Sequence, residues 1–124
     1  MNSTPISDHR DLDVWRLSMQ LARRLYTATA AMPVDERFGL TSQMRRAAVS
    51  IPSNIAEGYG RGTRKEYCQF IRVARGSAAE LQTQLLLAEN LEMLEPQAVD
   101  DLTEMVERVR QMLHALVRSL EQRA

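Results

Sequence analysis

Apolar residues recur at alternating steps of three and four along the first part of the chain, and this spacing predicts a helix rather than a strand. Two adjacent apolar stripes run through this segment, which is typical of a helix inside a bundle. We predict a helix over about residues 11–31, started by Asp8 or Asp11 and ended before Pro33. The stripes contain Leu12, Trp15, Met19, Ala22 and Tyr26, and Leu21, Leu25, Ala28 and Met32.

A second helix is predicted over about residues 41–59, where apolar residues again share one face. Pro52 lies inside this pattern. An interior proline removes one backbone hydrogen bond and clashes with the preceding turn. We therefore predict one helix with a kink near Val49 to Pro52, ended by the glycines at 58, 60 and 62.

Two longer helices follow. The sequence Thr63-Arg64-Lys65-Glu66 has the capping-box pattern and predicts a helix over about 63–91. Pro96 favours a first turn, and the apolar spacing after it predicts a last helix over about 96–121. Short connections between four helices predict an all-α fold, an antiparallel up-down-up-down four-helix bundle with a Pro-kinked second helix. It should form a single domain over residues 11–122, preceded by a flexible N-terminal segment over residues 1–10.

Composition excludes several classes of protein. The 124 residues contain one Cys and two His, too few for a disulfide framework or for a zinc site without a further ligand at short spacing. No apolar stretch is long enough to cross a membrane, and the N-terminus has no secretory pattern, so we expect a cytoplasmic protein.

No catalytic constellation is visible. His9 lies in the N-terminal segment, and His114 has Gln111, not a carboxylate, three residues before it. Di-iron bundles need Glu-x-x-His pairs, which are missing here. Cys68 has cations near it but no His close in sequence to act as a base. We expect no enzymatic activity, no metal and no cofactor.

Charge is distributed unevenly behind a net charge of zero. Residues 37–75 hold 8 basic and 2 acidic side chains (+6), whereas residues 76–124 hold 4 and 9 (−5). The start of the third helix carries a basic stripe about 100° wide. Such a stripe can neutralise the phosphates of RNA or DNA, or it can be a solvated face or an interface. Its candidate residues are Arg61, Arg64, Lys65, Arg72 and Arg75.

The second helix also has an unusually polar face. Ser50, Ser53 and Glu57 lie opposite its apolar stripe, Asn54 flanks that stripe, and Arg46 lies near one end. In an isolated bundle these side chains form the solvent-exposed face of the helix. If a second subunit covers it, the same groups form a hydrogen-bonded network that sets the register between subunits.

The run from Glu36 to Arg61, ERFGLTSQMRRAAVSIPSNIAEGYGR, resembles the bacterial four-helix bundle protein family, also called the 23S rRNA intervening-sequence protein family. The segments DLDVW at 11–15 and GSAAEL at 76–81 resemble it as well. These segments contain a polar set that we interpret as structural or interfacial, since no family activity attaches to it. The set is Arg45, Arg46, Ser50, Ser53, Asn54, Glu57 and Glu80.

The resemblance implies an assembly. A related branch, the accessory variability proteins of diversity-generating retroelements, forms a pentameric barrel that binds reverse transcriptase and nucleic acid through a strongly basic surface. A homopentamer is therefore expected here. This chain departs from that branch in its zero net charge and its acidic last helix.

Two functions remain open from the sequence. The first is a non-enzymatic, homo-oligomeric binding or scaffold module that contacts RNA or DNA phosphates. The second is a protein-only adaptor or structural oligomer, with no nucleic-acid ligand, whose basic and acidic faces pair between subunits.

Overall fold

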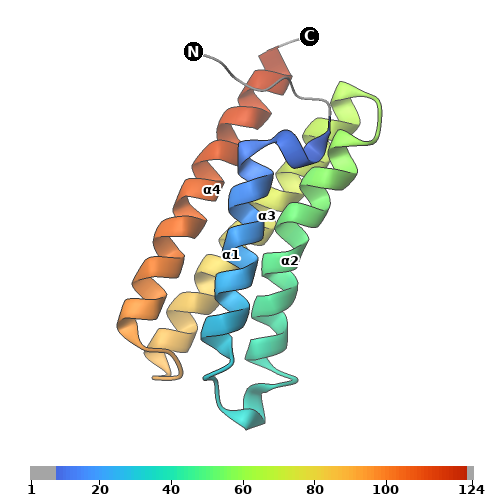
Figure 1. Cartoon of the computed structure of the whole chain (residues 1–124). Coiled ribbons are helices and arrows are strands. Elements are labelled where there is room, and N and C mark those ends of the chain that lie inside the picture. The colour runs from blue at the N-terminus through green and yellow to red at the C-terminus, as the bar shows by residue number, and fades with distance from the viewer. Residues whose placement is uncertain (1–7, 123–124) are drawn as a thin grey trace.

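The computed structural model describes residues 8–122, which form four α-helices and two short 3-10 helices with no strand among them. Figure 1 shows the helices running up and down side by side. Their bounds are η1 His9–Asp11, α1 Asp13–Thr29, η2 Val34–Glu36, α2 Leu40–Tyr59, α3 Arg64–Asn90 and α4 Pro96–Gln122.

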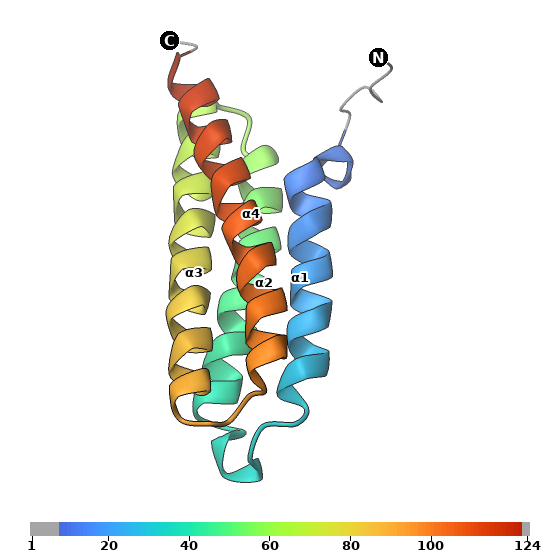
Figure 2. The ribbon, with the colours of Figure 1, turned by 90° about the vertical axis from the view of Figure 1, so that its left-hand side faces the viewer.

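Each helix packs against its neighbours in chain order, and α4 returns to contact α1, so the bundle closes. The view in Figure 2, turned by 90°, shows α4 between α3 and α1, with α2 behind. The most extensive contact joins α2 to α3, and the least extensive of the four joins α1 to α4. The predicted all-α, up-down-up-down four-helix bundle is confirmed.

The core consists of aliphatic side chains from all four helices. Burying one such side chain contributes about 1.5–3 kcal/mol, and this contribution holds the amphipathic helices together. The largest side chains that are fully buried are Leu21, Leu25, Met44, Ile51, Ile55, Ile71, Leu81, Leu85, Val99, Val106, Val109 and Leu113.

The start of the chain differs from the prediction. Residues 1–7 of the segment expected to be flexible lie outside the described residues, whereas His9–Asp11 form η1. Asp8 caps η1 by accepting a hydrogen bond from the Arg10 backbone N–H at 3.0 Å. Leu12 is extended, so α1 begins at Asp13 instead of residue 11, and it ends at Thr29.

The predicted second helix and the predicted cap of the third helix are both present, whereas the kink near Val49 to Pro52 stays a prediction. α2 runs through Pro52 without a break, as one helix. At the start of α3, the Thr63 hydroxyl accepts from the Glu66 N–H at 3.2 Å and donates to the Glu66 carboxylate at 3.0 Å. Between these helices, Gly62 has a φ of +93°, a conformation that favours glycine.

Gly58 allows α2 and α3 to come very close near the end of α2. A Cβ added to Gly58 would lie 2.7 Å from the Phe70 Cβ and 3.2 Å from the Tyr67 carbonyl oxygen. Any other residue here would collide with atoms fixed to the α3 backbone. The close approach therefore requires glycine.

Candidate functional site

The predicted basic stripe on α3 is largely occupied by partners within the chain. Arg72 makes an ion pair with Glu121 of α4. Arg75 is half-buried, and its Nη1 lies 3.1 Å from the His114 Nδ1, also on α4. α4 thus supplies partners that the apolar spacing of α3 did not reveal.

Arg61 is also engaged. Its Nε lies 3.1 Å from the Glu57 carboxylate, its Nη1 lies 4.0 Å from Glu66, and its guanidinium stacks over the Phe70 ring at 5.0 Å. Arg64 and Lys65 are exposed, and neither makes an ion pair with a described residue.

These partners reduce the charge of the stripe. Its five cations have three carboxylates within ion-pair distance, Glu57, Glu66 and Glu121, so the formal charge falls from +5 to +2 (5 − 3). Each exposed pair adds little stability, about 0–1 kcal/mol, but it lowers the local positive potential. The strongest site expected from the sequence is therefore weak in the folded chain.

The polar face of α2 contributes to the contact with α3. The Ser50 and Ser77 hydroxyls lie 2.8 Å apart, and the Asn54 amide donates to the Ser50 carbonyl at 2.8 Å and to its hydroxyl at 2.9 Å. Ser77 is 8% exposed. This network joins two helices of the same chain.

The remaining members of the predicted polar set lie elsewhere. Ser53 lines a hollow against α1, Glu57 binds Arg61, and Arg46 and Glu80 are exposed. Arg45 reaches α1, where its Nε donates to the Thr29 hydroxyl at 3.0 Å. The structure therefore brings only Ser50 and Asn54 of the set together in one network.

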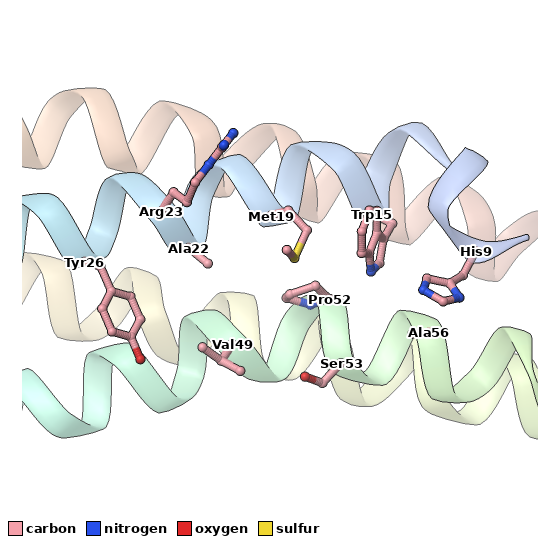
Figure 3. A pocket seen from close by; sticks show the side chains of 10 residues that line it. All are labelled: His9, Trp15, Met19, Ala22, Arg23, Tyr26, Val49, Pro52, Ser53 and Ala56. Atoms are coloured by element: carbon pink, nitrogen blue, oxygen red, sulfur yellow. The ribbon is translucent and has the colours of Figure 1, made fainter.

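An apolar hollow of about 490 Å³ lies between α1 and α2. In Figure 3, side chains of α1, among them Trp15 and Met19, face Val49 and Pro52 of α2 across it. The His9 ring meets Trp15 edge to face, with their centroids 5.2 Å apart, at one end. We call this space the apolar hollow.

A second hollow, of about 540 Å³, continues the first, because Tyr26 and Val49 line both. Its wall carries hydroxyl and guanidinium groups beside the Tyr26 and Phe38 rings. Arg45 lies over the Tyr26 ring at 4.4 Å and donates to the Tyr26 carbonyl at 3.3 Å. We call this space the arginine hollow. Its lining is Tyr26, Arg37, Phe38, Thr41, Ser42, Arg45, Arg46, Val49 and Ser50.

Sequence reasoning passed over this second site. The sequence pattern marks Arg45 and Arg46 as members of a motif but not as anion-binding groups, and it marks neither Arg37 nor Phe38. The available signal was a basic and an aromatic residue side by side in the linker before α2. The proximity of Tyr26, which lies 19 residues before Arg45, emerges only when α1 packs on α2.

Residues associated with catalysis do not converge in the described part of the chain. Cys68 is 7% exposed, and His114 contacts Arg75. Among residues 8–122, no three His, Cys, Asp or Glu side chains come together as a metal site. Within the same range, no helix has the length and apolarity to cross a membrane.

A family profile described as 23S rRNA-intervening sequence protein matches residues 10–115. The chain belongs to this family. The match covers α1, α2 and α3 completely and most of α4. Among curated proteins, none matches the chain.

The fold of this intervening-sequence family member is also found in a solved structure. A crystal structure of a protein of unknown function from the S23 ribosomal protein family of Bacteroides thetaiotaomicron superposes with a TM-score of 0.78. The two are 19% identical, and the match covers 85% of this chain and 95% of the other. At this identity the likeness shows a shared bundle.

Proposed function

We propose that this intervening-sequence family protein is a non-enzymatic, homo-oligomeric scaffold in the cytoplasm that holds RNA or DNA by its phosphates. The supporting observation is that two separate faces of one small bundle expose large apolar side chains. Exposed apolar clusters of this kind mark interaction surfaces. Assembly into a homopentamer, as the family resemblance implies, would cover them.

The first face is the apolar hollow between α1 and α2. Met19 and Val49 are 40% and 42% exposed at its surface. Tyr26, at the end shared with the arginine hollow, is 45% exposed. The Met19 side chain reaches toward α2 in Figure 3.

The second face is the outer side of α3. Val73, Leu86 and Leu87 of α3, and Leu91 directly after it, are 46–52% exposed. Gly76 and Ala79 lie among them and are exposed, and nothing approaches within 4 Å of a Cβ added to Gly76. Because the two faces differ, contact between them is head-to-tail, and such contacts generate a closed ring when the rotation between subunits closes.

The mass in light scattering tests the assembly. The wild-type protein should have the mass of five subunits of 14.1 kDa each. Met19→Asp and Leu87→Asp each place a charge in one of the two faces and should reduce the mass. Gln111→Asp, at an exposed position of α4, is the matched control. A monomeric wild-type protein, or variants that keep the full mass, would refute the proposed interface.

Binding to nucleic acid is tested by titrating RNA and DNA at low and physiological salt. Phosphate contacts make the affinity fall steeply as salt rises. An affinity no higher than that of a neutral control protein would refute this part of the proposal.

The second candidate is the protein-only adaptor. Its support is a pair of opposite charge clusters. Asp100, Asp101 and Glu104 are exposed at the start of α4. Arg37, Arg45 and Arg46, in α2 and the linker before it, make no ion pair with a described residue. If these groups pair between subunits, high salt should lower the mass, because exposed ion pairs are screened. An unchanged mass from low to high salt would argue against the adaptor.

A further inference from the structure

We propose that single-stranded nucleic acid binds in the arginine hollow, with its phosphates on the side of Arg37 and Arg46 and a base stacked on Phe38, and not on the α3 stripe. This inference rests on the proposed nucleic-acid function and names its site. Four features of the hollow support it: unpaired cations, free backbone donors, an unpartnered hydroxyl and an exposed aromatic ring.

The cations come first. Arg37, Arg45 and Arg46 all line the hollow, and none has a carboxylate of a described residue within ion-pair distance. Glu36 is the nearest acidic residue in sequence, and its carboxylate accepts from the Leu40 N–H at 3.0 Å. Arg45 is bonded to α1 through Thr29 and Tyr26, so Arg37 and Arg46 are the two guanidinium groups available to an incoming anion.

The start of α2 adds donors to the same wall. Gly39 provides no side-chain cap, and the N–H groups of Thr41 and Ser42 have no backbone acceptor. Unpaired N–H groups and the positive end of the helix dipole favour an anion at this point. Both residues line the hollow, next to Leu40, whose N–H already donates to the Glu36 carboxylate.

Thr41 supplies an independent sign of a missing partner. Its side chain is 6% exposed, and its hydroxyl oxygen is buried without a hydrogen-bond partner among the described residues. Leaving a buried hydroxyl unpaired is unfavourable, and such groups are rare in folded proteins. A small shift of the first turn onto a bound phosphate oxygen would satisfy it.

The exposed ring indicates what accompanies the phosphate. Phe38 is 87% exposed, and the Arg37 guanidinium lies 4.9 Å from its centroid. A phenylalanine ring in water next to cations is the arrangement on which unpaired bases stack, with little dependence on sequence. Duplex bases are already stacked on one another, so the site favours single strands. Inorganic phosphate would use the cations but leave the ring unused.

The experiment measures binding of a fluorescent single-stranded RNA and DNA to the full chain by anisotropy at several salt concentrations. The double variant Arg37→Ala/Arg46→Ala should weaken binding about ten-fold at low salt. It should also reduce the slope of log affinity against log salt by about 1.4, because each of the two lost phosphate contacts contributes about 0.7. Arg45 is left intact because it holds α1. The matched control Arg64→Ala/Lys65→Ala removes the same charge from α3 and should change binding by less than about two-fold.

Phe38→Ala separates stacking from charge. It should weaken single-strand binding several-fold while leaving the salt slope unchanged, because no phosphate contact is lost. Since Phe38 is almost fully exposed, its removal does not disturb the fold. Duplex of the same length should bind more weakly than the single strand, and inorganic phosphate should compete only at much higher concentration.

The outcomes distinguish the two proposals. If the wild-type protein does not bind nucleic acid, the proposed function and this site both fail. If the wild-type protein binds and only the control variant Arg64→Ala/Lys65→Ala weakens binding, the arginine hollow is not the site but the proposed function stands. Equal binding of duplex and single strand, or no effect of Phe38→Ala, overturns the stacking assignment. Light scattering on every variant shows whether a loss of binding reflects a loss of assembly.

Discussion

Gly58→Ala and Gly76→Ala make the same chemical change in two helices, but only the first puts a methyl group against a neighbouring helix. At Gly58 the new Cβ lies 2.7 Å from the Phe70 Cβ, closer than two such carbons approach in folded proteins. At Gly76 nothing lies within 4 Å. The pair therefore separates steric strain from the intrinsic preference of alanine for helices.

The magnitudes follow from general values. Alanine in place of glycine inside a helix stabilises by about 1 kcal/mol, which Gly76→Ala should gain in full. At Gly58 the overpacked methyl group costs about 1–3 kcal/mol. The higher helix propensity of alanine offsets less of this cost there, because Gly58 lies one residue before the end of α2. Gly58→Ala should therefore be less stable than Gly76→Ala by about 2 kcal/mol, or roughly 8 °C in Tm for a chain of this size.

The assay is denaturant unfolding followed by circular dichroism, at a protein concentration where light scattering gives both variants the same mass. Gly58→Ala should shift the midpoint down and Gly76→Ala should shift it up, each with an unchanged m-value. Equal stability of the two variants would refute the reasoning, because the close contact between α2 and α3 would then be absent in solution. A lower mass for Gly76→Ala alone would place Gly76 at a subunit contact.

Three further predictions concern hydrogen bonds and protons. Ser50→Ala leaves the Ser77 hydroxyl unpaired and should lower the free energy of unfolding by about 1–3 kcal/mol. In a double-mutant cycle, Ser50→Ala/Ser77→Ala should lose less stability than the sum of the two single variants. Additive losses would contradict the contact between the two hydroxyls. Hydrogen bonds from the Arg10 side chain and backbone lower the pKa of Asp8 from 3.8 to about 2. The stabilising contribution of the Asp8 carboxylate should thus be complete above about pH 3.8 and be lost as the pH falls toward 2. In an NMR titration, the pKa of Asp8 should be higher in Arg10→Ala than in the wild-type protein. Burial, with a smaller effect of Tyr59, raises the pKa of Tyr67 above its ordinary value of 10.0. The unfolded chain then releases this proton first, so stability should fall as the pH rises above 10, and Tyr67→Phe should remove both that fall and the late step in tyrosinate absorbance.

Local patterns in the sequence were sufficient to predict the four α-helices, but not the two short 3-10 helices. The capping sequence at Thr63 and the proline at Pro96 place the starts of α3 and α4 within one residue, because a helix end is decided by a few neighbouring groups. The start of α1 was missed by two residues, since Asp8 caps the preceding η1 instead. Capping groups compete for nearby N–H donors, and the sequence alone does not say which donor wins.

The candidate site was predicted less completely. The sequence correctly located a cationic middle segment, and the periodicity of α3 placed its cations on one stripe. It gave no information on which of them α4 would neutralise, because Arg72 and Glu121 are 49 residues apart. Ion pairs between helices depend on the register of one helix against the other, which the buried side chains set together.

The amino-acid sequence by itself determined four amphipathic helices, their order and a neutral sum of unevenly placed charges, because periodicity and capping act over one or two turns. Tertiary structure alone decided where positive charge remains available. Packing α4 on α3 gave partners to Arg72 and Arg75, and packing α1 on α2 brought Tyr26 beside Arg45, at the hollow that Arg37 and Arg46 also line. Electrostatic interactions reach only about 8 Å at physiological salt, so the accessible field of this protein is set by which side chains the fold makes neighbours.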